Sequence, residues 1–262
     1  MQKLIIAAIL ILTTFVMGSS LLAAEKQVVA GAGPSTKIVQ LFFYKFSTLP
    51  DANKYEFMIP PKSAKHAGGI RCSSNYVFGR TGRPLNAKEK AMNKGEIFLA
   101  QIPVAIAVGT GVGVDTLDMG QLEKIFTGQY KNWNEVGGPD VEILVVGREQ
   151  TEALFLTLKS RYSFFEDAKF SKVFKKDGHI VNFLKSPQGK YAIGFGAAPN
   201  FEGVDGLKMV SVDGLAVGVS VGLVYDLSNS NHPLVQSVTK YADSDSWRGA
   251  IIAAGFMAPN KR

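Results

Sequence analysis

The stretch VVAGAGPSTKIVQLFFYKF, residues 28–46, decides how the rest of the chain is interpreted. A short apolar run ends at Gly31-Ala32-Gly33, and a proline and two hydroxyl residues follow. Apolar residues then recur at the spacing of a well-buried helix, at Ile38, Val39, Leu41, Phe42, Phe43 and Phe46. A strand, a glycine turn and a helix N-terminus together form a place where backbone N–H groups can hold negative charge.

Three structures are compatible with this stretch: a nucleotide loop, a cup for a bare anion, and a tight turn. The dinucleotide fingerprint G-x-G-x-x-G is broken, because Thr36 stands where its third glycine belongs. The P-loop pattern occurs nowhere in the chain. Ser35 can simply cap its own helix, or it can join Thr36 in donating to an anion. The stretch alone does not decide between a capped tight turn and an anion cup.

The composition indicates a secreted soluble protein of one large domain or two small ones. The 262 residues are 46% hydrophobic and 19% charged. Residues 1–24 have the order of a signal peptide cut after Ala24: a positive start, an apolar centre and small residues. An uncleaved membrane anchor is the alternative. The single cysteine, Cys72, excludes an internal disulfide, and no cysteine follows the signal for lipid attachment. We therefore expect a periplasmic protein without a lipid anchor.

The net charge of +7 favours a small anion or an acidic partner. Nucleic acid is not expected, because the basic residues are scattered and form no basic block. His179 and His232 have no neighbouring ligands in the sequence, so neither a metal nor another cofactor is expected. The chain also lacks the G-x-S-x-G motif of a nucleophile elbow, and we expect no enzymatic activity.

Strands and helices alternate along the chain, which predicts an α/β fold with mainly parallel sheets. Residues 118–128 predict one compact helix, with Asp118 and Gln121 as a capping box and Gly128 at the end. The loops at 62–70, 78–85 and 145–155 resemble the glycine turn at 31–36. The carboxyl ends of strands meet at one crevice in such folds, so the four loops can converge there. The three further loops contribute the candidate ligand contacts Ser63 and His66, Arg80 and Thr81, and Arg148 and Thr151.

These motifs resemble the phosphate-binding-protein-like members of the type II periplasmic solute-binding superfamily. The resemblance is carried by GAGPSTKIVQLFF at 31–43, GGIRCSSNYVFGRTGRPLNAKE at 68–89, LEKIFTGQYKNWNEVGG at 122–138 and SPQGKYAIGF at 186–195. It implies two lobes joined by two crossing strands, near residues 104–108 and 193–196. Lobe I would combine residues 25–107 and 196–262, and lobe II would comprise residues 108–195.

The resemblance also implies a function. A monomeric protein of this kind holds a small oxyanion or carboxylate between its lobes and delivers it to the membrane permease of an ATP-binding-cassette importer. Two alternatives share the fold: an anion-sensing or structural module without a permease, and a phosphatase-like enzyme.

By position, Ser35 and Thr36 match the first-loop ligand contacts of that superfamily. His66 falls where a serine is usual, and Arg148 falls on the arginine that pairs with the anion. At Gly82 the third loop lacks the acidic or hydroxyl side chain that is usual there, and the fourth loop keeps only Thr151 of a Ser-Gly-Thr run. Added arginines without an acceptor favour a fully ionised oxyanion or a carboxylate, which guanidinium groups bind bidentately.

Overall fold

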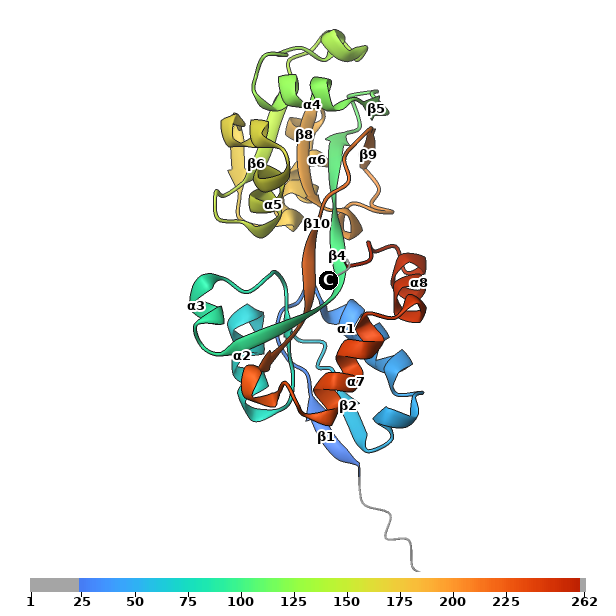
Figure 1. The fold of residues 1–262 in the computed structure, drawn as a ribbon. Helices are drawn as coiled ribbons and strands as arrows, with labels where there is room; N and C mark the ends of the chain where they lie inside the picture. Colours follow the sequence, from blue (N-terminus) through green and yellow to red (C-terminus); the bar gives the residue numbers. More distant parts are fainter. Residues whose placement is uncertain (1–23, 260–262) are drawn as a thin grey trace, which may run out of the picture.

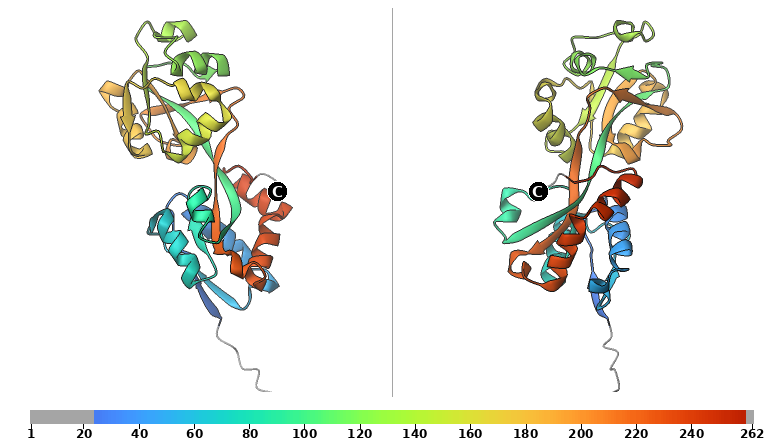
Figure 2. Two further views of the ribbon diagram at one scale, coloured as in Figure 1. Left: turned by 60° about the vertical axis from the view of Figure 1, so that its left-hand side comes forward. Right: turned by 45° about the vertical axis from the view of Figure 1, so that its right-hand side comes forward.

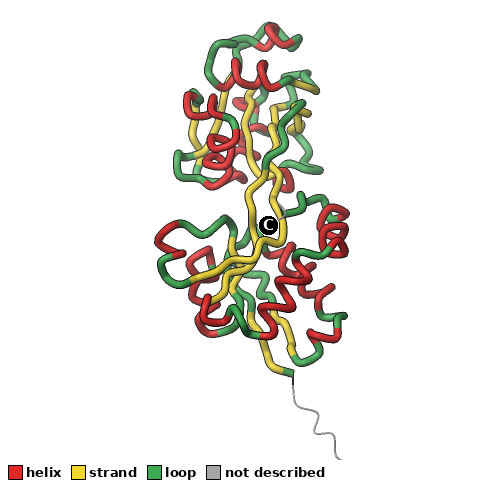
Figure 3. The backbone as a smooth tube through the Cα atoms, in the orientation of Figure 1, coloured by secondary structure: helices red, strands yellow, loops and turns green. Residues whose placement is uncertain are grey.

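The computed structural model describes residues 24–259, which form two α/β lobes stacked end to end (Figure 1). Two extended segments run through the waist between the lobes (Figure 3). One is the long strand β4 (Lys94–Gly109), and the other leads into β10 (Gly218–Asp226). The predicted signal peptide lies outside the described residues, apart from Ala24. No helix within residues 24–259 is both long and apolar enough to cross a membrane.

Lobe I contains the small sheet of β1 and β2, one end of the larger sheet that continues into lobe II through β4, and helices from both ends of the chain. Strands β1 and β2 pair in parallel, while β10 lies between β3 and β4 and is antiparallel to both. Helix α1 packs on α7 and α8, since the ring of Phe42 lies 5.3 Å from that of Tyr241 and 4.9 Å from that of Trp247 (Figure 2). The elements are β1 (Glu25–Val28), α1 (Thr36–Phe46), η1 (Pro50–Ala52), β2 (Tyr55–Met58), α2 (Lys65–Asn75), β3 (Gly79–Thr81), α3 (Ala87–Lys90), η6 (Leu227–Asn229), α7 (Pro233–Ala242) and α8 (Asp245–Ala253).

Lobe II is built around the strand order β4-β8-β6-β7, with β9 pairing to β4 and β5. Its apolar centre includes Phe126, Phe155, Phe165 and Phe195, all fully buried. The elements are β5 (Thr116–Leu117), α4 (Met119–Phe126), η2 (Trp133–Val136), β6 (Leu144–Arg148), α5 (Ala153–Arg161), η3 (Ser163–Asp167), β7 (Lys172–Phe174), α6 (Asp177–Leu184), η4 (Pro187–Gly189), β8 (Ala192–Ala197), η5 (Ala198–Asn200) and β9 (Leu207–Val212).

The second crossing between the lobes differs from the sequence-based boundary at residues 193–196. Strand β8 pairs with residues 104–108 of β4, and β9 pairs with residues 106–109, so both belong to lobe II. Strand β10 pairs with residues 94–103, and the chain therefore returns to lobe I between Val212 and Gly218. The difference has a simple cause: β8 is a central strand buried on both faces, and its apolar run looks like a crossing segment.

The predicted α/β class is confirmed, but the sheets are mixed rather than mainly parallel. Strand β6 is parallel to β7 and β8, as expected for βαβ units. Strand β4 is antiparallel to β8, β9 and β10, because the chain that leaves lobe I along β4 returns beside it.

Local signals in the sequence explain the helix boundaries around Trp133 and Asn134, the Trp-Asn motif. Helix α4 has the predicted capping box, in which the Gln121 N–H donates to Asp118 Oδ1 at 2.7 Å. Gly128 follows the helix with a φ of +75°, as expected for a residue that ends a helix. Trp133 is fully buried, and its indole N–H donates to the Tyr191 carbonyl at 2.8 Å, so it packs the core of lobe II.

Candidate functional site

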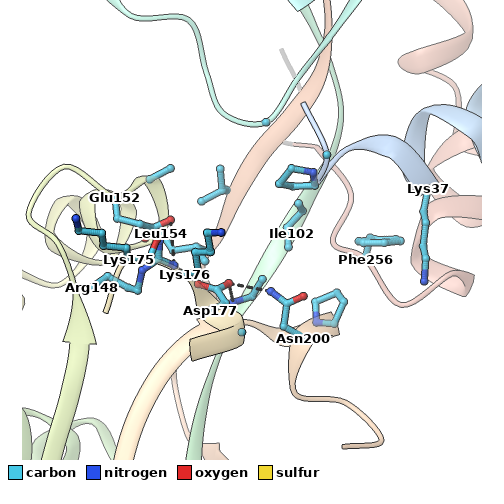
Figure 4. Close-up of a pocket in the computed structure, with 18 residues that line it drawn as sticks. Lys37, Ile102, Arg148, Glu152, Leu154, Lys175, Lys176, Asp177, Asn200 and Phe256 are labelled. Atoms are coloured by element: carbon cyan, nitrogen blue, oxygen red, sulfur yellow. Dashed lines mark hydrogen bonds and ion pairs between the residues drawn. The ribbon is translucent and has the colours of Figure 1, made fainter. Parts of the chain in front are cut away.

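A cleft of about 580 Å³ lies between the two lobes, beside β4 and β10 (Figure 4). We call these two strands the hinge strands. Lobe I contributes Gly33, Pro34, Lys37 and Gly82. Lobe II contributes Arg148, Glu152, Ala153, Leu154, Lys175, Lys176, Asp177, Gly178, Ala197, Pro199 and Asn200. Ile102 and Val219 come from the hinge strands, and Phe256 comes from the segment after α8.

Three helices begin at this cleft. The turn before α1 and its first residues line it through Gly33, Pro34 and Lys37. Residues 152–154 at the start of α5 and residues 176–178 at the start of α6 line the opposite wall. A helix N-terminus carries partial positive charge and N–H groups that lack partners within the helix, so this arrangement favours an anion.

The charged side chains of the cleft are mostly basic. Lys37, Arg148, Lys175 and Lys176 are opposed by only two carboxylates, Glu152 and Asp177. The three lysines are solvent-exposed, and the ion pairs found among residues 24–259 involve none of them. The lysines therefore give the cleft its available positive charge.

Arg148, the last residue of β6, lines the cleft but already has protein partners. Its side chain is 9% exposed and forms an ion pair with Asp177. Its Nε donates to the Phe174 carbonyl and its Nη2 to the Lys175 carbonyl, each at 3.1 Å. The Glu152 carboxylate lies 3.8 Å from Nη1. A network of this kind orients the guanidinium and offsets its charge before any ligand arrives.

The two carboxylates stand at helix starts and are held there by hydrogen bonds. Asp177 is the first residue of α6, and its Oδ2 accepts from the Ala197 N–H at 3.2 Å and the Asn200 amide at 2.8 Å. Glu152 caps α5 by accepting from the Phe155 N–H at 2.9 Å. Burial raises the pKa of Glu152, against the opposing effects of that hydrogen bond and of Arg148.

The hydroxyls of the first loop do not line the cleft. Ser35 is fully buried, and its hydroxyl donates to the Ala32 carbonyl at 3.2 Å instead of capping α1. The Thr36 hydroxyl oxygen is buried without a hydrogen-bond partner. Gly33 and Pro34 before these two residues and Lys37 after them are the ones that reach the cleft.

Arg80 and Thr81, the candidates of the third loop, are both fully buried. The Arg80 guanidinium donates to the carbonyls of Ala32 at 2.9 Å, Val29 at 2.8 Å and Lys62 at 3.3 Å. The Thr81 hydroxyl accepts from a backbone N–H of β10 at 3.2 Å. Arg80 thus fastens the first two loops to each other and does not line the cleft.

Glycines allow the backbones to pack closely around Arg80. A Cβ on Gly31 would lie 2.1 Å from the Arg80 carbonyl oxygen, and one on Gly69 would lie 2.2 Å from it. A Cβ on Gly79 would lie 1.9 Å from the Gly69 carbonyl oxygen. Gly68 and Gly69 lie within helix α2, so the expected loop at 62–70 ends at Ala64, just before the helix begins. These glycines serve backbone packing.

The other candidates of the second and fourth loops lie near the cleft or on the surface without lining it. Ser63 is exposed, and its hydroxyl accepts from the Lys65 N–H at 3.2 Å. Thr151 is exposed. His66 Nδ1 accepts from the N–H of Gly82, a cleft residue, at 3.4 Å. Burial lowers the pKa of His66, with a further lowering from the positive charge of Arg83.

Sequence reasoning missed Glu89, which joins the second and third loops. Its carboxylate accepts from both Arg83 Nη atoms, at 2.8 and 2.9 Å, and lies 3.3 Å from His66 Nε2. The Arg83 hydrogen bonds lower the pKa of Glu89 to about 2. The signal was present in the sequence, because Glu89 stands three residues after Asn86 and completes its capping box.

The cleft residues of α6 were also missed. Lys175 and Lys176 precede α6 and Asp177 begins it, and an acidic residue in the first turn is a helix-start signal. That signal predicts the helix but does not tell which wall of the molecule its first turn faces. Within residues 24–259, no group of three or more His, Cys, Asp and Glu side chains is arranged to hold a metal ion.

The structure has two α/β lobes, two chain crossings between them and a cleft at which helix N-termini meet. These features define the class of two-lobed binding proteins. A family model described as the PBP superfamily domain matches residues 20–252. The chain belongs to this superfamily, as its motifs predict.

The comparisons with individual proteins point in the same direction. The chain is 33% identical over 81 residues to the phosphate-binding protein PstS of Bacillus subtilis (strain 168), which covers 31% of this chain and 26% of that protein. It is 24% identical over 147 residues to PstS of Borreliella burgdorferi, which covers 53% of this chain and 52% of that one. These matches therefore span between a quarter and a half of the curated relatives.

A solved structure matches over a larger share. It is a putative phosphate ABC transporter substrate-binding protein with bound phosphate from Clostridium perfringens, with a TM-score of 0.64 and 19% identity. The match covers 90% of this chain and all of that one. At this identity the likeness supports the fold.

Proposed function

We propose that the protein is a periplasmic solute-binding protein, not an enzyme, that captures a small oxyanion such as phosphate between its lobes. It would deliver this anion to the permease of an ATP-binding-cassette importer. The observation that carries the proposal is the meeting of three helix N-termini, from both lobes, at one cleft with surplus positive charge. Relatives named phosphate-binding protein support the choice of oxyanion.

Capture works by closing the cleft. An anion that meets one lobe first gains the donors of the second lobe when the hinge at β4 and residues 213–217 bends. Closure excludes water, and each charge and N–H group then contributes more than it does at an open surface. The closed shape is what a permease can distinguish from the open one.

Lys175 and Lys176 supply the long-range attraction, since Arg148 is offset by Asp177. Arg148 and Asp177 together act as a scaffold that orients the start of α6 toward the ligand. His66 contributes indirectly through its hydrogen bond with the Gly82 N–H.

Thermal unfolding with phosphate, sulfate, molybdate, tungstate and small carboxylates tests the proposal. An anion at a hundred times its Kd should stabilise the protein by about 2.7 kcal/mol. Replacing the two cleft lysines of lobe II in Lys175→Gln/Lys176→Gln should weaken binding by about five- to tenfold at low salt. Lys88→Gln, on the exposed surface of α3, is the matched control and should bind like the parent. A protein that responds to no anion would refute the proposal.

Two further assays separate the alternatives that share the fold. Anion uptake by cells with and without the protein distinguishes an importer component from a module without a permease. Release of phosphate from a chromogenic monoester distinguishes a binding protein from a phosphatase-like enzyme, and we expect none.

A further inference from the structure

We propose that the cleft takes an organic anion, with a phosphate or carboxylate head and an apolar body, and that Phe256 contacts that body. This inference rests on the proposed function, because it specifies which kind of anion the same cleft binds.

The walls of the cleft are largely apolar. Both lobes, the hinge strands and the C-terminal segment contribute to this surface, through Pro34, Ile102, Ala153, Leu154, Ala197, Pro199, Val219 and Phe256. Sites for organic ligands combine an apolar lining with a few polar groups that fix orientation. A bare tetrahedral oxyanion has no apolar surface to bury, so it would gain nothing from these walls.

Hydroxyl donors are missing from the same walls. None of the described residues that line the cleft is a serine, threonine or tyrosine. Ser35 and Thr81 direct their hydroxyls to backbone groups of the protein, and Thr151 lies on the surface outside the cleft. The cleft can therefore hold one anionic head with lysines and helix N-termini, but the described residues of its walls offer that head no hydroxyl donor.

The hinge strands supply an apolar floor to the cleft. Val219 of β10 stands opposite Ile102 of β4 in the antiparallel register, and both side chains face the cleft. Their neighbours Gln101 and Ser220 form the adjacent pair and do not line it, as the alternation of side chains along strands requires. We call Ile102, Val219 and Phe256 the apolar floor.

Phe256 is held at this floor by the backbone on either side of it. Gly255, with a φ of +83°, turns the chain after α8, and the Phe256 N–H donates to the Ile251 carbonyl at 3.2 Å. Met257 pairs with Gln101 through two hydrogen bonds of 2.8 and 3.1 Å. Figure 4 draws Phe256 beside Lys37, across the cleft from Lys175. A ligand body can thus lie on Phe256 while its anionic head reaches the lysines.

Isothermal titration of the purified protein with phenyl phosphate, inorganic phosphate, benzoate, acetate and phenol tests the inference. Phenyl phosphate should bind at least about tenfold more tightly than inorganic phosphate. Phe256→Ala should weaken the binding of phenyl phosphate by about tenfold, which is the upper range for one aromatic contact. The affinity for inorganic phosphate should stay unchanged. Phe256→Leu should retain most of the affinity. Tyr44→Ala removes an aromatic ring that is 75% exposed on α1 and serves as the control.

The outcomes distinguish this inference from the proposed function. Equal or tighter binding of inorganic phosphate would overturn the inference and leave anion capture intact. Binding of none of the anions would overturn both. If phenol binds as tightly as phenyl phosphate, the anionic head contributes nothing to the affinity and the inference is overturned. Benzoate that binds more tightly than acetate and phenyl phosphate would support the inference and identify the head as a carboxylate.

Discussion

The ion pair of Arg148 and Asp177 leads to a quantitative prediction about stability. The two side chains are 9% and 12% exposed, so removing one leaves the other charge largely buried and without this ion-pair partner. Arg148→Ala also removes the donors to the carbonyls of Phe174 and Lys175. Breaking a buried pair costs about 3 to 5 kcal/mol. We expect Arg148→Ala to lower the free energy of unfolding by about 3 kcal/mol, which corresponds to a fall in Tm of about 6 to 12 °C for a chain of this size.

Denaturant unfolding of the parent, Arg148→Ala, Asp177→Ala and the double variant Arg148→Met/Asp177→Leu measures this energy. The double variant should lose less than the sum of the two alanine variants, because neither member of the pair remains as a buried charge without the other. A loss below about 1 kcal/mol in Arg148→Ala is what an exposed pair gives, and it would refute the argument. Arg148 would then be a freely available ligand contact, as its position in the fourth loop first suggests.

Two other predictions concern the packing of the loops. Gly79→Ala should destabilise the protein by about 3 kcal/mol or more, because its Cβ would collide with the Gly69 carbonyl. Gly249→Ala, with open space around its Cβ, should be neutral or stabilising. Thermal unfolding of both variants measures this difference, and equal effects would contradict the prediction. The depressed pKa of Glu89, about 2, implies stability that is present above pH of about 4.5 and is lost as the pH falls toward about 2. Glu89→Gln should remove this acid-dependent loss in unfolding measured from pH of about 6 to 2, and an unchanged pH profile would contradict the assigned contact with Arg83.

Much of the fold could be predicted because it depends on local signals. The capping box of Asp118 and Gln121 and the glycine that ends α4 are encoded within a few residues. The Trp-Asn turn is local as well, since Asn132 and Glu135 form its capping box and Gly137 adopts the left-handed conformation after it. Signals of this range can be read without knowing the tertiary structure.

The candidate site was predicted less well because it depends on contacts between distant segments. The sequence suggests that Arg80 serves an anion, but which backbone approaches Gly69 is decided by the packing of α2 against β3. Lys176 reaches the cleft only because α6 begins beside the end of β6, where Arg148 and Asp177 meet. Sequence spacing contains neither relation.

The most direct test of the central claim is a crystal structure of the protein with its bound anion. We predict an anionic head that contacts the start of α1 at residues 33–37 and the start of α6 at residues 175–178, with the lobes closed on it. An anion held by one lobe alone, or outside the cleft, would contradict the account.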